Sequence, residues 1–243
     1  EMDIAVDPVE GTDSVAWGRA NAISVIATGA KGKLLHAPEV YMEKIAVGPR
    51  AKGKISFGNS VAENIKVVAE AEKKEVGEVT AVVLDRSRHE QLIKEIRATD
   101  ARVRLISDGD VAGAIAPSLE NSAIDILMGS GKSPEAVLAA VGVKALGGEL
   151  LMQFAPRDDK EKEMIEECGK KCGVDNVLDV LNQDDVARGD ELTFTATGII
   201  DGPLVRGVRF DGEHVVTHSV VMRVKSKTIR YIETHHRSDR VPN

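Results

Sequence analysis

Cysteines, aromatic side chains and long apolar runs are scarce in this chain of 243 residues. The two cysteines, Cys168 and Cys172, lie four residues apart in a segment that we predict to be helical, and no further cysteine could pair with them. We therefore interpret both as reduced thiols of a cytoplasmic protein. No apolar run reaches the length of a transmembrane helix, and the N-terminus lacks the pattern of a signal peptide. We expect no membrane partner.

Positive charge is also in deficit, with 32 Lys and Arg residues against 39 Asp and Glu residues and a formal net charge of −7. Nucleic-acid phosphates are bound by basic surfaces, so this balance argues against nucleic acid as a partner. The hydrophobic fraction of 42% is typical of a globular protein with one large domain or two smaller ones. Binding an anionic metabolite would require a metal ion or a local basic cluster.

The chain starts abruptly. Glu1, Met2 and Asp3 lead directly into an apolar run, Ile4–Val6, that we predict to be the end of a buried strand. There is no initiator methionine and no lead-in segment. We therefore expect the chain to be incomplete at its N-terminus.

The segment at residues 7–13, D-P-V-E-G-T-D, is the most informative stretch. It places two carboxylates, Asp7 and Glu10, three residues apart across a predicted proline turn, and carboxylate oxygens suit Mg²⁺ or Mn²⁺. Gly11 would let a ligand approach the backbone, and a helix that begins near Thr12 would favour an anion at its N-terminus. An ordinary turn with a capping threonine uses the same residue types, so both interpretations stay open here.

The hydrophobic pattern predicts an α/β fold. Strands are expected at residues 21–28 and 41–47, and a helix at 60–73 with Ser60 as its N-cap. From Val79 onward, short apolar strands at 79–84, 103–107, 124–128 and 149–154 alternate with helices, which predicts a mostly parallel sheet. After Asp190 we expect only strands, at 192–200, 204–210, 215–225 and 229–232. In parallel sheets, ligands bind beyond the carboxyl ends of the strands.

Polar residues follow three of these strand ends. The first is Asp85–His89, whose two arginines could clamp a phosphate through bidentate hydrogen bonds. The second is Asp108–Asp110, which suits sugar hydroxyls or a metal ion. The third is a predicted glycine-rich turn at Gly129–Lys132, followed by a helix that begins at Pro134 and carries Glu135 in its first turn. Solvated loops and ordinary turns explain the first two segments equally well in isolation.

A nucleotide-binding P-loop is not expected, although residues 131–133 read G-K-S. That motif requires a glycine five residues before Gly131, where this chain has Ile126. Pro134 also falls where the helix of a P-loop would already be under way. A nucleotide-binding α/β domain is therefore disfavoured.

Taken in order, these segments resemble the bacterial class II fructose-1,6-bisphosphatases of the GlpX type, within the lithium-sensitive phosphatase superfamily. The resemblance covers nearly all of the chain and rests on D-P-V-E-G-T at 7–12, Y-M-E-K-I-A-V-G-P at 41–49, D-R-S-R-H at 85–89, I-S-D-G-D at 106–110, A-T-G-I-I-D-G at 196–202 and T-H-S-V-V-M at 217–222.

The resemblance implies a fold and an assembly. The fold is a layered α-β-α-β-α sugar-phosphatase sandwich, here incomplete at its N-terminus. Residues 1–75 would be the remainder of an N-terminal α+β metal-binding domain, and residues 76–243 a C-terminal α/β substrate-binding domain. A homo-oligomer, either a dimer or a tetramer, is also implied.

The resemblance also assigns metal and catalytic roles. Asp7, Glu10 and Glu135 would bind Mn²⁺ or Mg²⁺, and Thr12 would hold the attacking water, so Asp7, Glu10 and Thr12 would be catalytic. Family members carry further metal carboxylates upstream of Asp7, on segments that this chain lacks.

The implied substrate contacts are more numerous. Tyr41, Arg86 and Arg88 would bind the second phosphate of the sugar, and Asp108 and Asp110 would bind its hydroxyls. Family members usually have glycine at the position of Lys132. The complete set of implied substrate-binding residues is Glu10, Gly11, Thr12, Tyr41, Arg86, Ser87, Arg88, Asp108, Gly109, Asp110 and Lys132.

The expected activity is the metal-dependent hydrolysis of fructose 1,6-bisphosphate to fructose 6-phosphate and phosphate, a step of gluconeogenesis. Two alternatives remain: a phosphatase for sedoheptulose bisphosphate or another sugar or inositol phosphate, and an inactive chain that only binds a sugar phosphate. The arginine pair at residues 86 and 88 favours a bisphosphate, because a monophosphate has no second anion to clamp.

Overall fold

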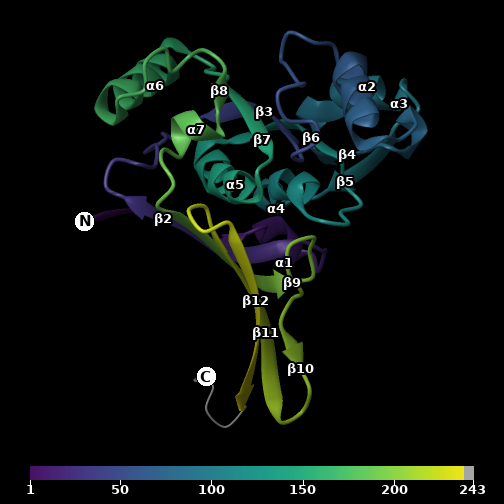
Figure 1. Cartoon of the computed structure of the whole chain (residues 1–243), viewed down its shortest axis with the longest axis vertical. Coiled ribbons are helices and arrows are strands. Elements are labelled where there is room, and N and C mark those ends of the chain that lie inside the picture. The colour runs from purple at the N-terminus through teal and green to yellow at the C-terminus, as the bar shows by residue number, and fades with distance from the viewer. Residues whose placement is uncertain (238–243) are drawn as a thin grey trace.

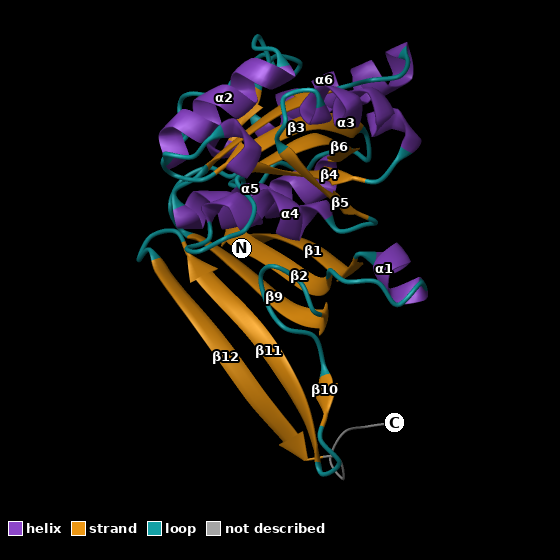
Figure 2. Ribbon diagram, turned by 90° about the vertical axis from the view of Figure 1, so that its right-hand side faces the viewer, coloured by secondary structure: helices purple, strands orange, loops and turns teal. Residues whose placement is uncertain are grey.

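A computed structural model of the chain describes residues 1–237. Two β-sheets lie one above the other, with helices α4 (Asp110–Ile115) and α5 (Ser133–Leu146) between them (Figures 1 and 2). Helices α2 (Val61–Glu72) and α3 (Glu90–Arg97) cover the opposite face of one sheet. The layers therefore run α-β-α-β, and the predicted layered α/β fold is confirmed.

The upper sheet is mixed rather than mostly parallel. In spatial order its strands are β5 (Arg102–Ile106), β4 (Thr80–Leu84), β6 (Ile126–Lys132), β3 (Tyr41–Val47), β7 (Glu149–Phe154) and β8 (Leu181–Asn182). Strand β4 is parallel to β5 and β6, but β3 is antiparallel to both β6 and β7. The prediction was wrong because β3, from an earlier part of the chain, inserts between the two strands that α5 connects.

The second sheet is antiparallel. Its strands in spatial order are β1 (Met2–Glu10), β2 (Ala22–Ala30), β9 (Leu192–Ile200) and β11 (His214–Arg223), with β10 (Arg209–Phe210) and β12 (Thr228–Arg237) each paired with β11. The strand predicted at 204–210 is reduced to β10. The apolar side chains of Leu204 and Val205, which suggested a strand, are buried from a loop instead.

The main core lies between the sheets, around α5. This helix is apolar on most of its surface, as expected for a helix enclosed by two sheets. Helix α4 packs closely against it, since a Cβ added at Gly142 would lie 2.3 Å from Cδ1 of Ile115. A second core joins α2 and α3 to the upper sheet through residues such as Val68 and Ile96. The predicted N-cap Ser60 is confirmed and forms a capping box with Glu63.

The outward face of the antiparallel sheet is open along β1. Met2, Ile4 and Val6 are between 59% and 63% exposed, so within residues 1–237 a third helical layer is not seen over this strand. Helices α6 (Asp159–Cys172) and α7 (Gln183–Val186) lie beside β8 (Figure 1). None of the described helices combines the length and the apolar character needed to cross a bilayer.

Each sheet draws strands from both sides of residue 75. Strand β3 pairs with β6 and β7, and β2 pairs with β9. The division into domains at residues 75 and 76 therefore does not follow the sheets, and it stays a prediction.

Candidate active site

A β-bulge in β1 shapes the first part of the site. Strand β1 continues through Pro8 to Glu10, in place of the predicted proline turn. Asp7 pairs with Val25 and Glu10 pairs with Ile23, so two residues of β1, Pro8 and Val9, oppose the single residue Ser24 of β2. The extra residue brings Asp7 and Glu10 to the same face of the sheet, whereas residues three apart in a regular strand face opposite sides. Pro8, which has no amide hydrogen, is tolerated at such an irregularity.

The face that Asp7 and Glu10 share points toward the start of α5. There Glu135 lies in the first turn, directly after β6. Ligand oxygens of Asp7, Glu10 and Glu135 all lie within 4.8 Å of one another. The structure thus brings together the three carboxylates that the sequence suggested as metal ligands.

Burial raises the pKa of two carboxyl groups in this acidic cluster. Desolvation, followed by the nearby Asp110, Glu135 and Asp7 carboxylates, holds the pKa of Glu10 well above its usual range, although its Oε1 accepts a hydrogen bond from the Val111 amide at 3.1 Å. Desolvation likewise raises the pKa of Glu135. A divalent cation would relieve this repulsion.

The donor set fits a hard divalent cation. The Oε2 atom of Glu135 is buried and has no hydrogen-bond partner within residues 1–237. Buried polar atoms are rarely left without a partner, so a carboxylate oxygen without one that faces two further carboxylates fits a cation site. Ligands that are all oxygen suit Mg²⁺ or Mn²⁺.

A short helix, α1 (Thr12–Ala16), follows the cluster. Its N-cap, Gly11, has a left-handed backbone with φ 96°, and a Cβ there would lie 2.5 Å from the Asn21 carbonyl oxygen. Only glycine fits this position without strain. Thr12 is exposed at the first helical position, two residues after Glu10.

The loop at residues 108–110 lies against the cluster. Asp110 begins α4, and its Oδ2 accepts a hydrogen bond from Nζ of Lys44 at 2.6 Å, an ion pair whose two side chains are 8% and 2% exposed. Lys44 also donates to the Lys132 carbonyl oxygen. A Cβ at Gly131 would come within 2.1 Å of Asp110 Oδ2. Lys44 thus fixes Asp110 between β3 and β6.

Arg86 is engaged by two carboxylates. Its Nη2 donates to Asp13 Oδ2 at 2.9 Å and lies 3.6 Å from Asp108 Oδ1. Asp108 Oδ2 also accepts a hydrogen bond from the Asp13 amide at 3.0 Å. This network joins α1 to the end of β5, so Arg86 would have to share its guanidinium with a substrate phosphate.

Arg88 is held in a different way. Its Nε donates to Ser130 Oγ at 3.0 Å, and its Nη2 donates to the Ser130 carbonyl oxygen at 2.8 Å. The guanidinium carbon lies 4.9 Å from the centre of the Tyr41 ring, which stabilises the cation over the aromatic face. The implied phosphate ligands Tyr41 and Arg88 are therefore neighbours, while Ser87 is exposed in the same loop.

The predicted glycine-rich turn at residues 129–132 is wrong. These residues are the last four of β6, and Lys132 pairs directly with Tyr41 of β3. Three small residues can extend a strand when a partner strand supplies the hydrogen bonds, and β3 does so here. Lys132 is exposed and lies 3.1 Å from Glu39.

Sequence reasoning missed three polar residues that shape the site: Asn21, Lys44 and Ser130. Asn21 donates hydrogen bonds from Nδ2 to the carbonyl oxygens of Asp108 and Gly109. The lysine could have been found, because it interrupts the otherwise apolar second half of β3. The roles of the other two depend on contacts across more than 40 residues of sequence.

A layered α/β fold with a carboxylate cluster beside strand ends is compatible with the class of metal-dependent phosphatases. The profile described as bacterial fructose-1,6-bisphosphatase, glpX-encoded, matches residues 1–236. The chain therefore belongs to the GlpX-type class II fructose-1,6-bisphosphatase family.

Two cyanobacterial relatives illustrate the similarity. A protein named D-fructose 1,6-bisphosphatase class 2/sedoheptulose 1,7-bisphosphatase from Synechococcus sp. (strain JA-2-3B'a(2-13)) is 39% identical over 252 residues, which cover 98% of this chain and 71% of the relative. A similarly named protein from Acaryochloris marina (strain MBIC 11017) is 39% identical over 249 residues, with the same coverage.

Proposed function

We propose that this chain hydrolyses a phosphate monoester of fructose 1,6-bisphosphate in a metal-dependent reaction. The single observation that supports this most is the convergence of Asp7, Glu10 and Glu135 at the N-terminal ends of α1 and α5. Carboxylates of this number and burial suit a divalent cation that also binds a substrate phosphate. The resemblance of the chain to class II fructose-1,6-bisphosphatases over residues 1–236 supports the substrate class.

Each residue of the site would have a role that follows from its position. Asp7, Glu10 and Glu135 would hold Mg²⁺ or Mn²⁺, which when bound neutralises phosphate charge and lowers the pKa of a bound water. The amides of Gly11 and Thr12 would orient the reacting phosphate, and the Thr12 hydroxyl would hold the attacking water. Phosphoryl transfer depends mainly on positioning and charge stabilisation, so a Cys or His nucleophile is not required.

The second phosphate would be bound at the other end of the site. Arg88 lies over Tyr41 at the start of β3, and Lys132 stands opposite on β6. The positive charges of Arg88 and Lys132 suit a phosphate. The hydroxyls of the sugar would lie between the two phosphates, at Asp108 and Asp110. Ser87 would contact the same phosphate from the loop.

Sedoheptulose 1,7-bisphosphate is a second candidate substrate. The cyanobacterial relatives carry both activities in their names. The two sugars share the same pair of terminal phosphates and differ by one hydroxylated carbon, so the same arginine could bind either. Comparing kcat/KM for the two bisphosphates distinguishes them.

The first experiment is phosphate release from fructose 1,6-bisphosphate by the purified chain, with Mg²⁺ or Mn²⁺ and with EDTA. We expect release that requires the metal and is lost in Asp7→Ala, with Glu70→Ala on the exposed side of α2 as the matched control. Release that is unchanged in Asp7→Ala would contradict the metal assignment. A folded chain without release would favour the binding-only alternative.

A binding measurement separates the metal site from turnover. Calorimetric titration with Mn²⁺ should show binding to the wild-type chain and to Glu70→Ala, and a loss of affinity of at least about tenfold in Glu135→Gln, since one charged ligand is removed. Unchanged affinity in Glu135→Gln would place the cation elsewhere.

A further inference from the structure

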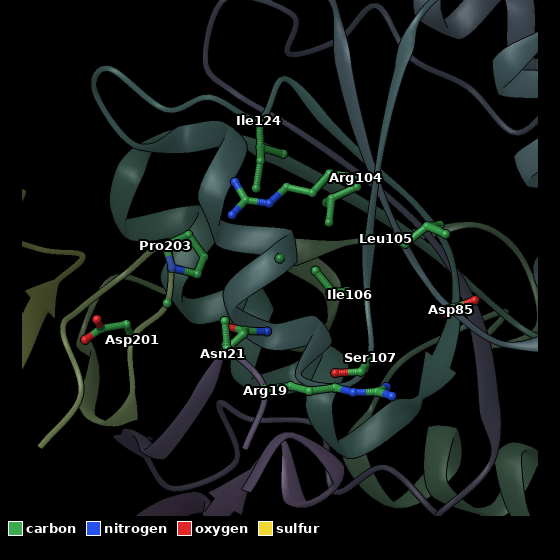
Figure 3. A pocket seen from close by; sticks show the side chains of 14 residues that line it. Arg19, Asn21, Asp85, Arg104, Leu105, Ile106, Ser107, Ile124, Asp201 and Pro203 are labelled. Atoms are coloured by element: carbon green, nitrogen blue, oxygen red, sulfur yellow. The ribbon is translucent and has the colours of Figure 1, made fainter. Parts of the chain in front are cut away.

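A cavity of about 510 Å³ opens beside α4 (Figure 3), and no residue of the acidic cluster lines it. It lies between β5 and the loop at residues 201–203, and Arg19 and Asn21 close one side. None of Asp7, Glu10 and Glu135 lines it, nor do Tyr41, Arg88 and Lys132. The proposed substrate groups thus leave this space unused.

The walls of the cavity combine apolar surface with a few polar groups. Val82, Ile106 and Ile124 supply apolar surface, and Leu105 on the edge strand β5 is 40% exposed there. Ser107 and Asn21 add hydrogen-bonding groups. Sites for small molecules are typically apolar clefts of this volume with a small number of placed polar groups.

The side chains of two arginines in the cavity do not contribute hydrogen bonds or ion pairs to the described part of the fold. Neither Arg19 nor Arg104 has a side-chain hydrogen bond or ion pair with any residue of the described range 1–237. Figure 3 shows Arg104 beside Ile124 and Arg19 beside Ser107. A guanidinium next to apolar surface suits an organic anion, because it pairs with a carboxylate or phosphate and also stacks on flat groups.

The acidic side chains in the cavity do not cancel this charge. Asp201 Oδ1 accepts a hydrogen bond from the Gly207 amide at 2.7 Å, and Oδ2 lies 3.7 Å from Arg209. Asp85 is exposed at the opposite end from Asp201 (Figure 3). Because Asp201 is already paired, Asp85 is the remaining carboxylate among the lining residues. The two positive charges of the arginines therefore exceed its single negative charge.

Asn21 connects the cavity to the candidate active site. The backbone amide of Asn21 donates a hydrogen bond to the Asp201 carbonyl oxygen at 2.8 Å, on the cavity side. Its side chain donates to the carbonyl oxygens of Asp108 and Gly109 at 2.9 and 2.7 Å, on the active-site side. Asn21 is 5% exposed and has φ 76°, and a Cβ at Gly109 would lie 2.6 Å from its Nδ2. These contacts leave little room for the loop at residues 201–203 or the loop at residues 108–110 to move without the other.

We propose that this cavity is a second binding site, for a small organic anion with an apolar body, and that Asn21 transmits its occupancy to the loop at residues 108–110. The binding part stands without the proposed function, and the coupling part rests on it. Since Asp108 contacts Asp13 and the Val111 amide contacts Glu10, a shift of that loop changes the acidic cluster.

The binding part is tested with naphthalene-2-sulfonate as the probe in calorimetric titrations. We expect Arg104→Gln to raise its Kd roughly tenfold or more, as loss of a charge-assisted hydrogen bond does. Ala20→Trp, which fills the cavity from its exposed rim, should weaken binding without a change of charge. Neutral 2-naphthol and inorganic sulfate should each bind more weakly than the complete probe.

Matched variants locate the bound probe. Arg97→Gln on α3 and Arg88→Gln in the proposed phosphate clamp lie outside the cavity and should bind the probe as the wild type does. Equal affinity in Arg104→Gln, Ala20→Trp and wild type would overturn the proposal, because the probe would then bind elsewhere. Binding lost only in Arg88→Gln would place the probe in the active site and would also overturn it.

The coupling part has a readout that needs no turnover. The Kd of Mn²⁺ is measured with and without saturating probe, and coupling between two sites must be reciprocal. We expect at least about a threefold change in the wild type and a clearly smaller change in Arg104→Gln at the same probe concentration, because the cavity of the variant is then only partly occupied. Probe binding with an unaltered Mn²⁺ Kd would overturn the role of Asn21. A chain that binds the probe but releases no phosphate would contradict the proposed function alone.

Discussion

His89 and Ser130 are joined by a hydrogen bond that fixes the tautomer of the histidine. The Ser130 amide donates to Nε2 of His89 at 2.8 Å, so Nδ1 carries the proton and donates to the Leu84 carbonyl oxygen at 2.8 Å. The ring is 3% exposed, and it leaves little space at Gly129, where a Cβ would meet it at 3.1 Å. Because Ser130 in turn binds Arg88 twice, His89 supports the proposed phosphate clamp from behind.

The first prediction concerns this support. We expect His89→Gln, whose amide oxygen can accept from Ser130, to keep a KM for fructose 1,6-bisphosphate close to that of the wild type. His89→Asn is too short to reach Ser130 but can still donate to Leu84. It should raise the KM by roughly tenfold, because Ser130 would then no longer hold Arg88 in place and about one hydrogen bond between Arg88 and the phosphate would be lost. Hydrolysis of p-nitrophenyl phosphate, which has no second phosphate, should be equal in both variants.

These two variants also provide the control for a purely structural effect. Both replace a buried ring with a smaller amide, so both should lower the Tm to a similar extent. A KM increase that follows the Tm rather than the Ser130 contact would refute the positioning role of His89.

The second prediction concerns the pH dependence of stability. Desolvation, aided by Arg88 and Arg86, lowers the pKa of His89. The unfolded chain therefore binds a proton more readily than the folded one, and this contribution to stability is complete above the ordinary pKa of about 6.5 and is lost as the pH falls below it. We expect the Tm to fall more steeply between pH 7 and 5 in the wild type than in His89→Gln. Parallel Tm curves would show that His89 does not titrate in this range.

The third prediction follows from the opposite shift at Glu10. Its raised pKa means that the folded state retains the proton more tightly, so the contribution is favourable at low pH and is lost as the pH rises through the folded pKa. In EDTA at pH 8, Glu10→Gln should therefore have a higher Tm than the wild type, because Gln keeps the Val111 hydrogen bond without the charge. Added Mn²⁺ should raise the Tm of the wild type and have little effect on the variant. A variant with a lower Tm in EDTA would contradict the repulsion in this cluster.

The fourth prediction concerns the buried ion pair of Lys44 and Asp110. Its side chains are 2% and 8% exposed, so Lys44→Met leaves a carboxylate buried without its partner. We expect the free energy of unfolding in urea to fall by about 3–5 kcal/mol. Lys44→Met with Asp110→Asn should recover part of the loss, since the uncompensated charge is removed. Equal losses in the single and double variants would show that packing of the lysine stem dominates.

Local features of the fold could be predicted from the sequence, whereas features that depend on partner strands could not. The N-cap at Ser60 and the extent of β3 and β7 follow from neighbouring residues, and the structure confirms them. The direction of β3 between β6 and β7 depends on a partner strand, β6, whose paired residues lie 79 to 91 positions away in the sequence.

The same distinction applies to the candidate site. Asp7, Glu10 and Glu135 could be grouped by resemblance, and the structure does bring them together. Neither the resemblance nor the spacing indicated that Arg86 is already paired with Asp13, because that ion pair spans 73 residues.

The last prediction concerns the β-bulge that aligns the carboxylates. Side chains alternate across a strand, so inserting one alanine between Val9 and Glu10 would shift Glu10 by one position along β1 and turn it away from the face that Asp7 occupies. The insertion should abolish Mn²⁺ binding, as measured by calorimetry, even though every carboxylate is retained in the sequence. Val9→Ala keeps the residue count and removes only part of an exposed side chain, so its Mn²⁺ affinity should be within about twofold of the wild type. Circular dichroism must show that the insertion variant is folded. If that folded variant bound Mn²⁺ normally, the pairing of β1 would have shifted to preserve the cluster, and the residue count of the bulge would not be what sets the geometry of the metal site.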